Sequence, residues 1–301
     1  MEWISLLSNY TFQVVALGSA LLGIISGVFG SFAVLRKQSL LGDVVAHSAL
    51  PGIVLAFLLT GSKNIEQMLM GALITGLLAV LVILGIIKTT RIKIDAVLAL
   101  VLSVFFGFGT VLLTYSQKVP NANQAGLDRF IYGQAASLIK KDIQFMLICG
   151  MVLLLIAIIF WKELKILCFD EEFAKTIGLP TGKLNLALSF FIVLTIIIGL
   201  QTVGVILMSA MLIAPAVAAR QWSNKLSTMV ILSGTFGAVS GILGTIISSS
   251  VKKLPTGPVI VVCVTVIAMF SILFAPNRGI IYKMYQRRRN KKYFELERKG
   301  I

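Results

Sequence analysis

Asp43 and His47 lie four residues apart in the apolar segment from Ser39 to Leu59, and His47 is the chain's single histidine. On an α-helix, side chains at positions i and i+4 lie on the same face, so this carboxylate and this imidazole would point to one place. A charged carboxylate is costly in lipid and therefore normally faces a bundle interior or a water-filled path. Carboxylate and imidazole are ligands of Mn²⁺, Fe²⁺ and Zn²⁺. The pair predicts a metal site inside a membrane protein; the alternative is that the two side chains only pair with each other or cap a neighbouring helix.

Pro51 adds a second feature to the same predicted helix. A proline inside a helix lacks the N–H that would donate to the carbonyl four residues earlier, which here belongs to His47. The helix should therefore kink or locally unwind beside the imidazole, and broken helices at membrane depth often line substrate sites in transporters. We expect Asp43, His47 and the His47 carbonyl to line a metal path near the outer half of the membrane.

Two side chains do not complete a tetrahedral or octahedral metal shell. A two-fold partner, identical or related, would bring its own carboxylate and imidazole and give four ligands, so the ligand set favours an oligomer. The oxygen and nitrogen ligands suit manganese, iron and zinc. The single histidine leaves a relatively hard set, which favours manganese slightly.

The composition is that of a membrane protein. Of the 301 residues, 57% are hydrophobic and 13% are charged, and the mean hydropathy is +0.96. The formal net charge is +15, but the lysines and arginines cluster in predicted inter-helix loops and in the C-terminal tail. That distribution is typical of topology signals and of contact with anionic membrane lipid. We therefore expect no nucleic-acid partner.

Hydropathy predicts an all-α fold, a polytopic bundle of about eight or nine transmembrane helices with one short cytoplasmic helix. Segment 203–219 is the doubtful span, because it is short and has Pro215 near its end. We expect one transmembrane domain over 1–275 and a basic cytoplasmic tail over 276–301. The candidate spans are 12–35, 39–60, 66–87, 94–115, 143–161, 184–200, 203–219, 226–249 and 257–275.

Positive charge predicts the orientation of the bundle. If the spans alternate, the basic residues all fall on one side, which should be cytoplasmic, and the N-terminal residues 1–11, which carry no lysine or arginine, lie outside. Nine crossings reconcile an outside N-terminus with a cytoplasmic C-terminus, whereas eight would move one terminus to the other side. The basic segments are 36–37, 88–93, 162–183, 220–225 and 287–289.

The predicted cytoplasmic loop over 162–183 contains the signals of a short helix. An N-cap, two acidic residues in the first turn and a glycine after the last turn define it: Asp170, Glu171, Glu172 and Gly178. Phe173 and Ile177, one turn apart, would give this helix an apolar face. Such a helix is either a docking element for a soluble partner or a helix that lies on the bilayer surface.

Residues 178–183 also look like a phosphate-binding loop, but only three residues separate Gly178 from Gly182, and Leu184 stands where Ser or Thr is needed. No other segment predicts a nucleotide site. The chain is therefore not expected to be an enzyme, and any ATP hydrolysis would take place in a separate subunit. No permanently bound cofactor is expected either. The outer loop, 116–142, contains a moderately apolar part, 128–138, that could form a re-entrant or interfacial helix.

Several blocks of the chain resemble one family, the permease subunits of bacterial ATP-binding-cassette importers for manganese, zinc and iron. The most specific block runs from Gly30 to Gly52 and includes Asp43, His47 and Pro51. The other blocks follow in the family's order along nearly the whole chain: 126–133, 169–180 and 203–216.

The resemblance implies a membrane permease that pairs with a second permease, associates with two cytoplasmic ATPase subunits and receives metal from an extracellular binding protein. It implies a location in the bacterial cell membrane and an alternating-access mechanism. Asp43 and His47 match the residues implicated in metal passage. The segment from Asp170 to Gly178 matches the helix that couples the permease to the ATPase.

Three other functions agree less well with the sequence. An importer of a metal chelate or cofactor would need a wide vestibule without metal ligands, which the Asp43–His47 pair disfavours. A self-sufficient metal carrier or channel would not need the short helix in the cytoplasmic loop. An intramembrane metalloprotease would need more metal ligands than a chain with one histidine offers.

Overall fold

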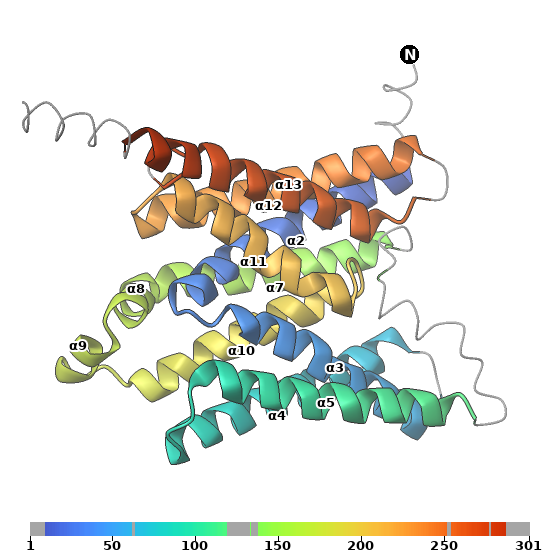
Figure 1. Cartoon of the computed structure of the whole chain (residues 1–301). Helices are drawn as coiled ribbons and strands as arrows, with labels where there is room; N and C mark the ends of the chain where they lie inside the picture. The colour runs from blue at the N-terminus through green and yellow to red at the C-terminus, as the bar shows by residue number, and fades with distance from the viewer. Residues whose placement is uncertain are drawn as a thin grey trace, which may run out of the picture.

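The protein is described here from a computed structural model, in which residues 10–61, 64–118, 133, 138–251, 254–276 and 278–286 are placed. Within these ranges every regular element is a helix (Figure 1), which confirms the all-α prediction. The helices are α2 (Tyr10–Leu35), α3 (Ser39–Thr60), α4 (Ile65–Thr89), α5 (Ile94–Ser116), α7 (Lys140–Ile159), α8 (Trp161–Phe169), α9 (Glu171–Thr176), α10 (Thr181–Leu200), α11 (Val205–Trp222), α12 (Leu226–Ser250) and α13 (Thr256–Phe274).

Each of the nine predicted spans corresponds to one long helix, displaced by a few residues at most. Eight of these, all except α11, are long and apolar enough to cross a membrane by length and composition, within the part of the chain that the structure describes. The doubtful segment 203–219 forms α11, an 18-residue helix with Pro215 inside it. At about 1.5 Å per residue α11 is about 27 Å long, slightly less than the hydrocarbon core of a bilayer. Whether α11 crosses completely stays a prediction.

Small residues bring the helices of the bundle into backbone contact. A Cβ atom added to Gly23 of α2 would lie 2.3 Å from the backbone of Gly237 on α12, so neither position has room for a larger residue. One turn further along, the hydroxyl of Ser233 on α12 donates a 2.7 Å hydrogen bond to the carbonyl oxygen of Gly27. Close approach of this kind replaces the hydrophobic effect as the source of helix association in lipid.

The helix that carries Asp43 and His47 lies in the interior of the bundle. α3 packs against α4, α5, α10 and α11, and more of its side chains are buried than exposed. Gly52 makes the close approach of α3 to α4 possible, because a Cβ there would lie 2.1 Å from the carbonyl oxygen of Gly71. The side chains of Asp43 and His47 are therefore only partly exposed, at 35% and 18%.

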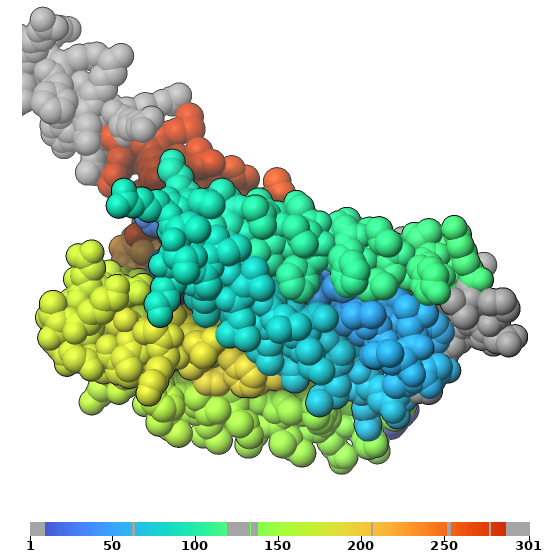
Figure 2. All heavy atoms as spheres, turned by 90° about the horizontal axis from the view of Figure 1, so that it is seen from below, coloured from blue at the N-terminus to red at the C-terminus, as the bar shows by residue number. Residues whose placement is uncertain are grey.

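The outer surface of the bundle is apolar. Figure 2 shows one face, with α5 along one edge, α4 toward the middle and α7 along the opposite edge. Large apolar side chains are exposed along these helices, as expected for a surface in contact with lipid, including Leu78, Leu81, Val104, Val111, Ile148 and Leu155.

The basic loops gather at one end of the bundle (Figure 1), where the α2–α3, α4–α5 and α11–α12 turns lie with α8 and α9. The predicted loop 162–183 is shorter than expected, because α8 occupies Trp161–Phe169 and α10 begins at Thr181. The triple-arginine segment 287–289, most of the outer loop with its candidate helix 128–138, and residues 1–9 lie outside the described residues.

Candidate functional site

Asp43 and His47 face each other on α3, as their spacing predicts. The Nε2 atom of His47 lies 3.4 Å from the Oδ1 atom of Asp43, and the side chains are 18% and 35% exposed, respectively. This separation is longer than a good hydrogen bond. The two groups therefore form a loose pair with room to adjust, inside an apolar bundle where charged groups are rare.

Asp43 also lines a groove of about 440 Å³ between α3, α11 and α13. The hydroxyl of Ser209 on α11 lies beside the Asp43 carboxylate. Ser209 lies in one of the segments that carry the family resemblance, but the sequence analysis gave it no role. A serine in the first turns of an otherwise apolar helix was the signal that could have singled it out. The other residues that line the groove are mostly apolar: Ser39, Leu40, Ala210, Ile213, Ala214, Val217 and Ala268.

The imidazole of His47 is held from the other side by α5. The ring of Phe106 meets it edge to face, and the Nδ1 atom is buried without a hydrogen-bond partner in the described part of the protein. The Nε2 atom points instead toward Asp43. The ring is therefore oriented with Nε2 toward the Asp43 carboxylate and with Nδ1 on the buried side.

The pair lies nearer to one end of α3 than to the other. α3 begins at Ser39, next to the basic end of the bundle, so at about 1.5 Å per residue Asp43 is about 6 Å and His47 about 12 Å along the helix. The pair thus lies in the half of α3 nearer the basic end. A site in the outer half of the membrane and a cytoplasmic basic end are therefore incompatible expectations, and the depth of the pair in the membrane stays a prediction.

Pro51 lies one turn beyond His47 and is buried. α3 runs as a helix from Ser39 to Thr60 through Pro51, so local unwinding is absent over these residues, and a kink stays a prediction. The proline ring packs against Gly109 of α5, where an added Cβ would lie 2.9 Å from the proline Cδ atom. Pro51 therefore contributes to the α3–α5 contact next to the pair.

Asp43 and His47 are not joined by further candidate metal ligands. Among the described residues, no group of three or more His, Cys, Asp or Glu side chains is placed to hold a metal ion. The three cysteines are free. The candidate site in one chain therefore consists of one carboxylate and one imidazole.

The short helix α9 has the limits that the sequence predicts. Asp170 is its N-cap, and the Asp170 carboxylate accepts a 2.8 Å hydrogen bond from the Phe173 N–H. The chain then turns at Gly178, whose φ is 81°. The Gly178 N–H donates to the Lys175 carbonyl at 3.1 Å, and the Leu179 N–H donates to the Ala174 carbonyl at 3.0 Å. This pair of bonds is the Schellman motif, which favours glycine at the left-handed position.

The sides of α9 differ in what they contact. Phe173 and Ile177 are about half exposed, at 52% and 49%, whereas Ala174 is fully buried. The charges of Glu171 and Glu172 lie in the first turn and that of Lys175 in the last, which suits the helix dipole. Glu171 also turns toward the bundle and contacts Arg36 and Asn185. The sequence analysis used Arg36 only as a topology charge and did not consider Asn185.

The Asp43–His47 pair and the short helix α9 are separate regions of the described structure. Asp43 and His47 lie inside the bundle, whereas Asp170 to Gly178 lies at its basic end. Both regions are connected to the α2–α3 turn, the first through the chain and the second through Arg36.

A protein-family model described as the ABC 3 transport family matches residues 8–275. The chain is 49% identical over 284 residues to the zinc transport system membrane protein TroC of Treponema pallidum, covering 94% of this chain and 95% of that protein. It is 48% identical over 281 residues to the manganese transport system membrane protein MntC of Bacillus subtilis, covering 93% of this chain and 64% of that protein.

A solved structure has the same fold. It is described as PsaBC from Streptococcus pneumoniae in complex with Fab, and its matching chain is 32% identical with a TM-score of 0.80. The match covers 92% of this chain and 96% of that chain.

Proposed function

Because the chain belongs to the ABC 3 transport family, we propose that it is the membrane permease subunit of an ATP-driven importer of manganese or zinc. The observation that carries the proposal is the Asp43–His47 pair, a carboxylate and an imidazole one turn apart beside a groove in an apolar bundle. Two relatives are described as zinc and manganese transport proteins, and this ligand pair suits both metals.

The separation of the two ligand atoms fits a single ion. With metal–ligand bonds of about 2.1 Å, two ligands of one ion lie about 3.4 Å apart in a tetrahedral shell and about 3.0 Å apart in an octahedral one. Oδ1 of Asp43 and Nε2 of His47 are 3.4 Å apart. Small side-chain movements therefore bring both atoms onto one ion, and two protein ligands per chain leave the ion free to depart.

A second permease subunit, identical or related, completes the site in this proposal. Its Asp and His would raise the number of protein ligands from two to four, which one chain does not reach among its described residues. The groove beside Asp43 has a volume of about 440 Å³, which is ample space for an ion.

The energy for transport comes from two cytoplasmic ATPase subunits that dock on α9, and the metal arrives on an extracellular binding protein. The exposed Phe173 and Ile177 side chains support α9 as the docking element. In an alternating-access cycle, an outward vestibule would end at Asp43 and His47, and movement of α9 would reopen the bundle toward the cytoplasm. The chain itself catalyses no reaction in this scheme.

The basic end of the bundle is cytoplasmic in the proposed orientation, and the N-terminus is outside. The tail over 276–301 then lies at the cytoplasmic surface of the membrane, where its basic residues meet anionic lipid. Arg278 donates a 2.8 Å hydrogen bond to Asn224 in the α11–α12 turn, which places Arg278 beside the basic end.

The proposed function is tested by reconstituting the permease with its ATPase and its binding protein in proteoliposomes. We expect ATP-dependent uptake of Mn²⁺ or Zn²⁺ that is lost in Asp43→Asn and His47→Ala, while the ATPase still co-purifies. Asp95→Asn is the matched control, because it also removes a carboxylate but lies exposed in the first turn of α5. Unchanged uptake in both site variants would refute the assignment of the pair, and no uptake of either metal would point to a chelate as the substrate.

The orientation is tested with single cysteines in a chain that lacks Cys149, Cys168 and Cys263. Lys118→Cys follows α5 and Lys225→Cys precedes α12, and both positions are exposed. In intact cells an impermeant maleimide should label Lys118→Cys only. Labelling of Lys225→Cys alone would reverse the proposed orientation.

A further inference from the structure

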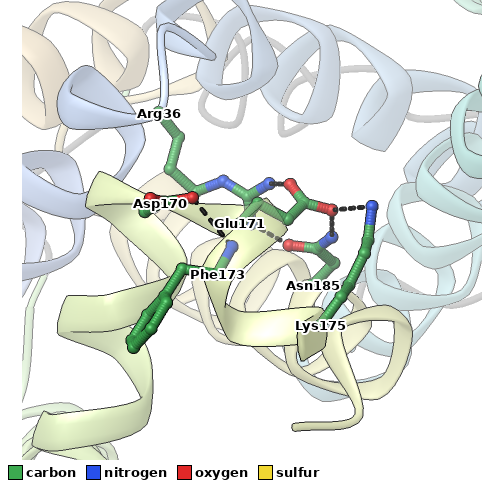
Figure 3. Close-up of polar contacts among 6 residues, drawn as sticks. All are labelled: Arg36, Asp170, Glu171, Phe173, Lys175 and Asn185. Atoms are coloured by element: carbon green, nitrogen blue, oxygen red, sulfur yellow. Dashed lines mark hydrogen bonds and ion pairs between the residues drawn. The ribbon is translucent and has the colours of Figure 1, made fainter. Parts of the chain in front are cut away.

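The α2–α3 turn is connected to the start of α9 by a cluster of polar side chains (Figure 3). The Nη2 atom of Arg36 lies 3.0 Å from the Oε2 atom of Glu171, the first residue of α9. The other guanidinium nitrogen donates to the Asn185 side-chain oxygen on α10, and the Asn185 amide donates to Oε1 of Glu171 at 3.2 Å. Arg36, Glu171 and Asn185 thus form a closed ring of three contacts.

This cluster lies on one side of α9, opposite to Phe173. Glu171 and the buried Ala174 face the bundle, whereas Phe173 points away from the cluster in Figure 3. A partner that docks on Phe173 would therefore press on a helix whose inner side is bonded to Arg36.

Arg36 stands at a turn that connects two helices rigidly. α2 ends at Leu35, and Lys37 in the following turn lies in the left-handed region, at φ 57°. The Lys37 N–H donates to the Val34 carbonyl at 3.1 Å, and the Gln38 N–H donates to the Ala33 carbonyl at 2.9 Å. α3 begins directly afterwards, at Ser39. Because the turn is fixed by these hydrogen bonds, displacement of Arg36 displaces the start of α3.

Arg36 is more buried than a basic residue that only determines membrane orientation needs to be. A lysine or arginine that only sets orientation lies in water or among lipid headgroups, but the Arg36 side chain is 10% exposed and has two protein partners. The planar guanidinium suits such a two-sided role, because its donors point in fixed directions.

Glu171 has a second cation within its own helix. The Nζ atom of Lys175 lies 3.6 Å from Oε1 of Glu171. Because Lys175 lies on α9 itself, its contact moves with Glu171 and transmits nothing to the rest of the bundle. The contact of Glu171 to Arg36, in contrast, joins α9 to the α2–α3 turn.

We propose that Arg36 is a positioning residue that carries movement of α9 through Glu171 and Asn185 to the α2–α3 turn, and from there to Asp43 and His47. This inference rests on the proposed function, because it takes α9 as the ATPase-docking element and α3 as the carrier of the metal pair.

The test is a double-mutant cycle on Arg36→Gln and Glu171→Gln in the reconstituted complex. The measurement is the number of metal ions taken up per ATP hydrolysed, together with the amount of co-purified ATPase. We expect each single variant to keep the ATPase and to lower the ratio about tenfold, and the double variant to be no worse than either. Lys165→Gln is the control, because it removes an exposed charge from the neighbouring α8.

Additive losses in the double variant, an unchanged ratio, or loss of the ATPase from the single variants would each overturn the proposal. A second measurement does not depend on the transported substrate: deuterium exchange of the backbone at 39–47, with and without ATP. We expect ATP to change this exchange in the wild-type complex and not in Arg36→Gln. The same change in Arg36→Gln would also overturn the proposal, whereas absence of uptake by the wild type alone would count against the proposed function.

Discussion

The ring of Phe106 on α5 contacts the edge of the His47 imidazole on α3, with the ring centroids 4.8 Å apart and the ring planes at 74°. Edge-to-face aromatic pairs of this kind contribute about 0.5–1.5 kcal/mol beyond the area they bury. The orientation of the only histidine therefore depends on a residue of another helix, which is not itself a metal ligand.

Replacing Phe106 by Ala should weaken metal capture without preventing assembly. Loss of about 0.5–1.5 kcal/mol of orientation energy would raise the KM for metal uptake about two- to tenfold, while the maximal rate changes less. The measurement is the dependence of uptake on metal concentration in proteoliposomes. Phe108→Ala is the control, because Phe108 lies on the same helix, is 52% exposed and points to another face. An equal KM in both variants would show that His47 does not need the Phe106 ring.

If the ATPase docks on α9, substitutions on the exposed side of α9 should weaken ATPase binding without affecting the folding of the permease. Phe173→Asp and Ile177→Asp place a charge on side chains that are 52% and 49% exposed, so the permease should fold normally. The amount of co-purified ATPase should fall at least about tenfold, because a charge buried in an apolar interface without a partner is costly.

The matched control for this pair is Ile139→Asp. Ile139 is 55% exposed and is the N-cap residue of α7, at the end of the bundle opposite to α9. This variant should keep its full complement of ATPase. Normal co-purification of Phe173→Asp and Ile177→Asp would mean that α9 is only a surface helix.

The positions of the long helices follow from the sequence because hydrophobic length determines them. Each of the nine predicted spans is a helix, and the limits of α9 follow from the cap at Asp170 and the left-handed Gly178. The family resemblance to metal importer permeases is confirmed by the match over residues 8–275. These features depend on local composition or on motifs that a single segment contains.

Features that depend on contacts between distant segments could not be predicted from the sequence. α8 was missed because the charges of Lys162, Glu163 and Lys165 directly after the predicted span indicated a loop. The cluster of Arg36, Glu171 and Asn185 joins residues up to 149 positions apart, and no local pattern predicts that pairing. The depth of Asp43 in the membrane stays a prediction, because it depends on the orientation of the bundle as well as on the start of α3 at Ser39.

The contact between α2 and α12 predicts a strong difference between two glycine positions. A Cβ atom at Gly237 would lie 2.1 Å from the carbonyl oxygen of Gly23, whereas a Cβ at Gly107 of α5 would meet nothing within 4 Å. Gly237→Ala should therefore force the helices apart and cost about 1–3 kcal/mol. Gly107→Ala should leave stability unchanged or raise it slightly, because alanine favours the helix. Thermal unfolding in detergent measures both, and equal melting temperatures would contradict the close approach.

The buried thiol of Cys168 in α8 predicts low reactivity. Burial raises the pKa of Cys168 to about 12 from its ordinary value of 9.0, and the Arg36 guanidinium only partly opposes this. Because the thiolate is the reactive form, alkylation of the folded protein at neutral pH should be about a thousandfold slower than that of an unperturbed thiol. The same shift leaves stability independent of this group below pH 9.0. Between pH 9.0 and about 12 the unfolded chain has lost a proton that the folded chain keeps, so the free energy of unfolding falls as the pH rises.

Both consequences are measurable in a chain with Cys149→Ala and Cys263→Ala, which leaves one thiol. Maleimide labelling at pH 7.5 should be slow in the folded protein and complete within minutes after denaturation in detergent. Thermal melts from pH 8 to 10 should show a decline that is shallower when Cys168 is also replaced by Ala, because that variant lacks the titrating group. Rapid labelling of the folded protein at pH 7.5, or identical melting curves for the two chains above pH 9, would show that α8 does not bury this thiol.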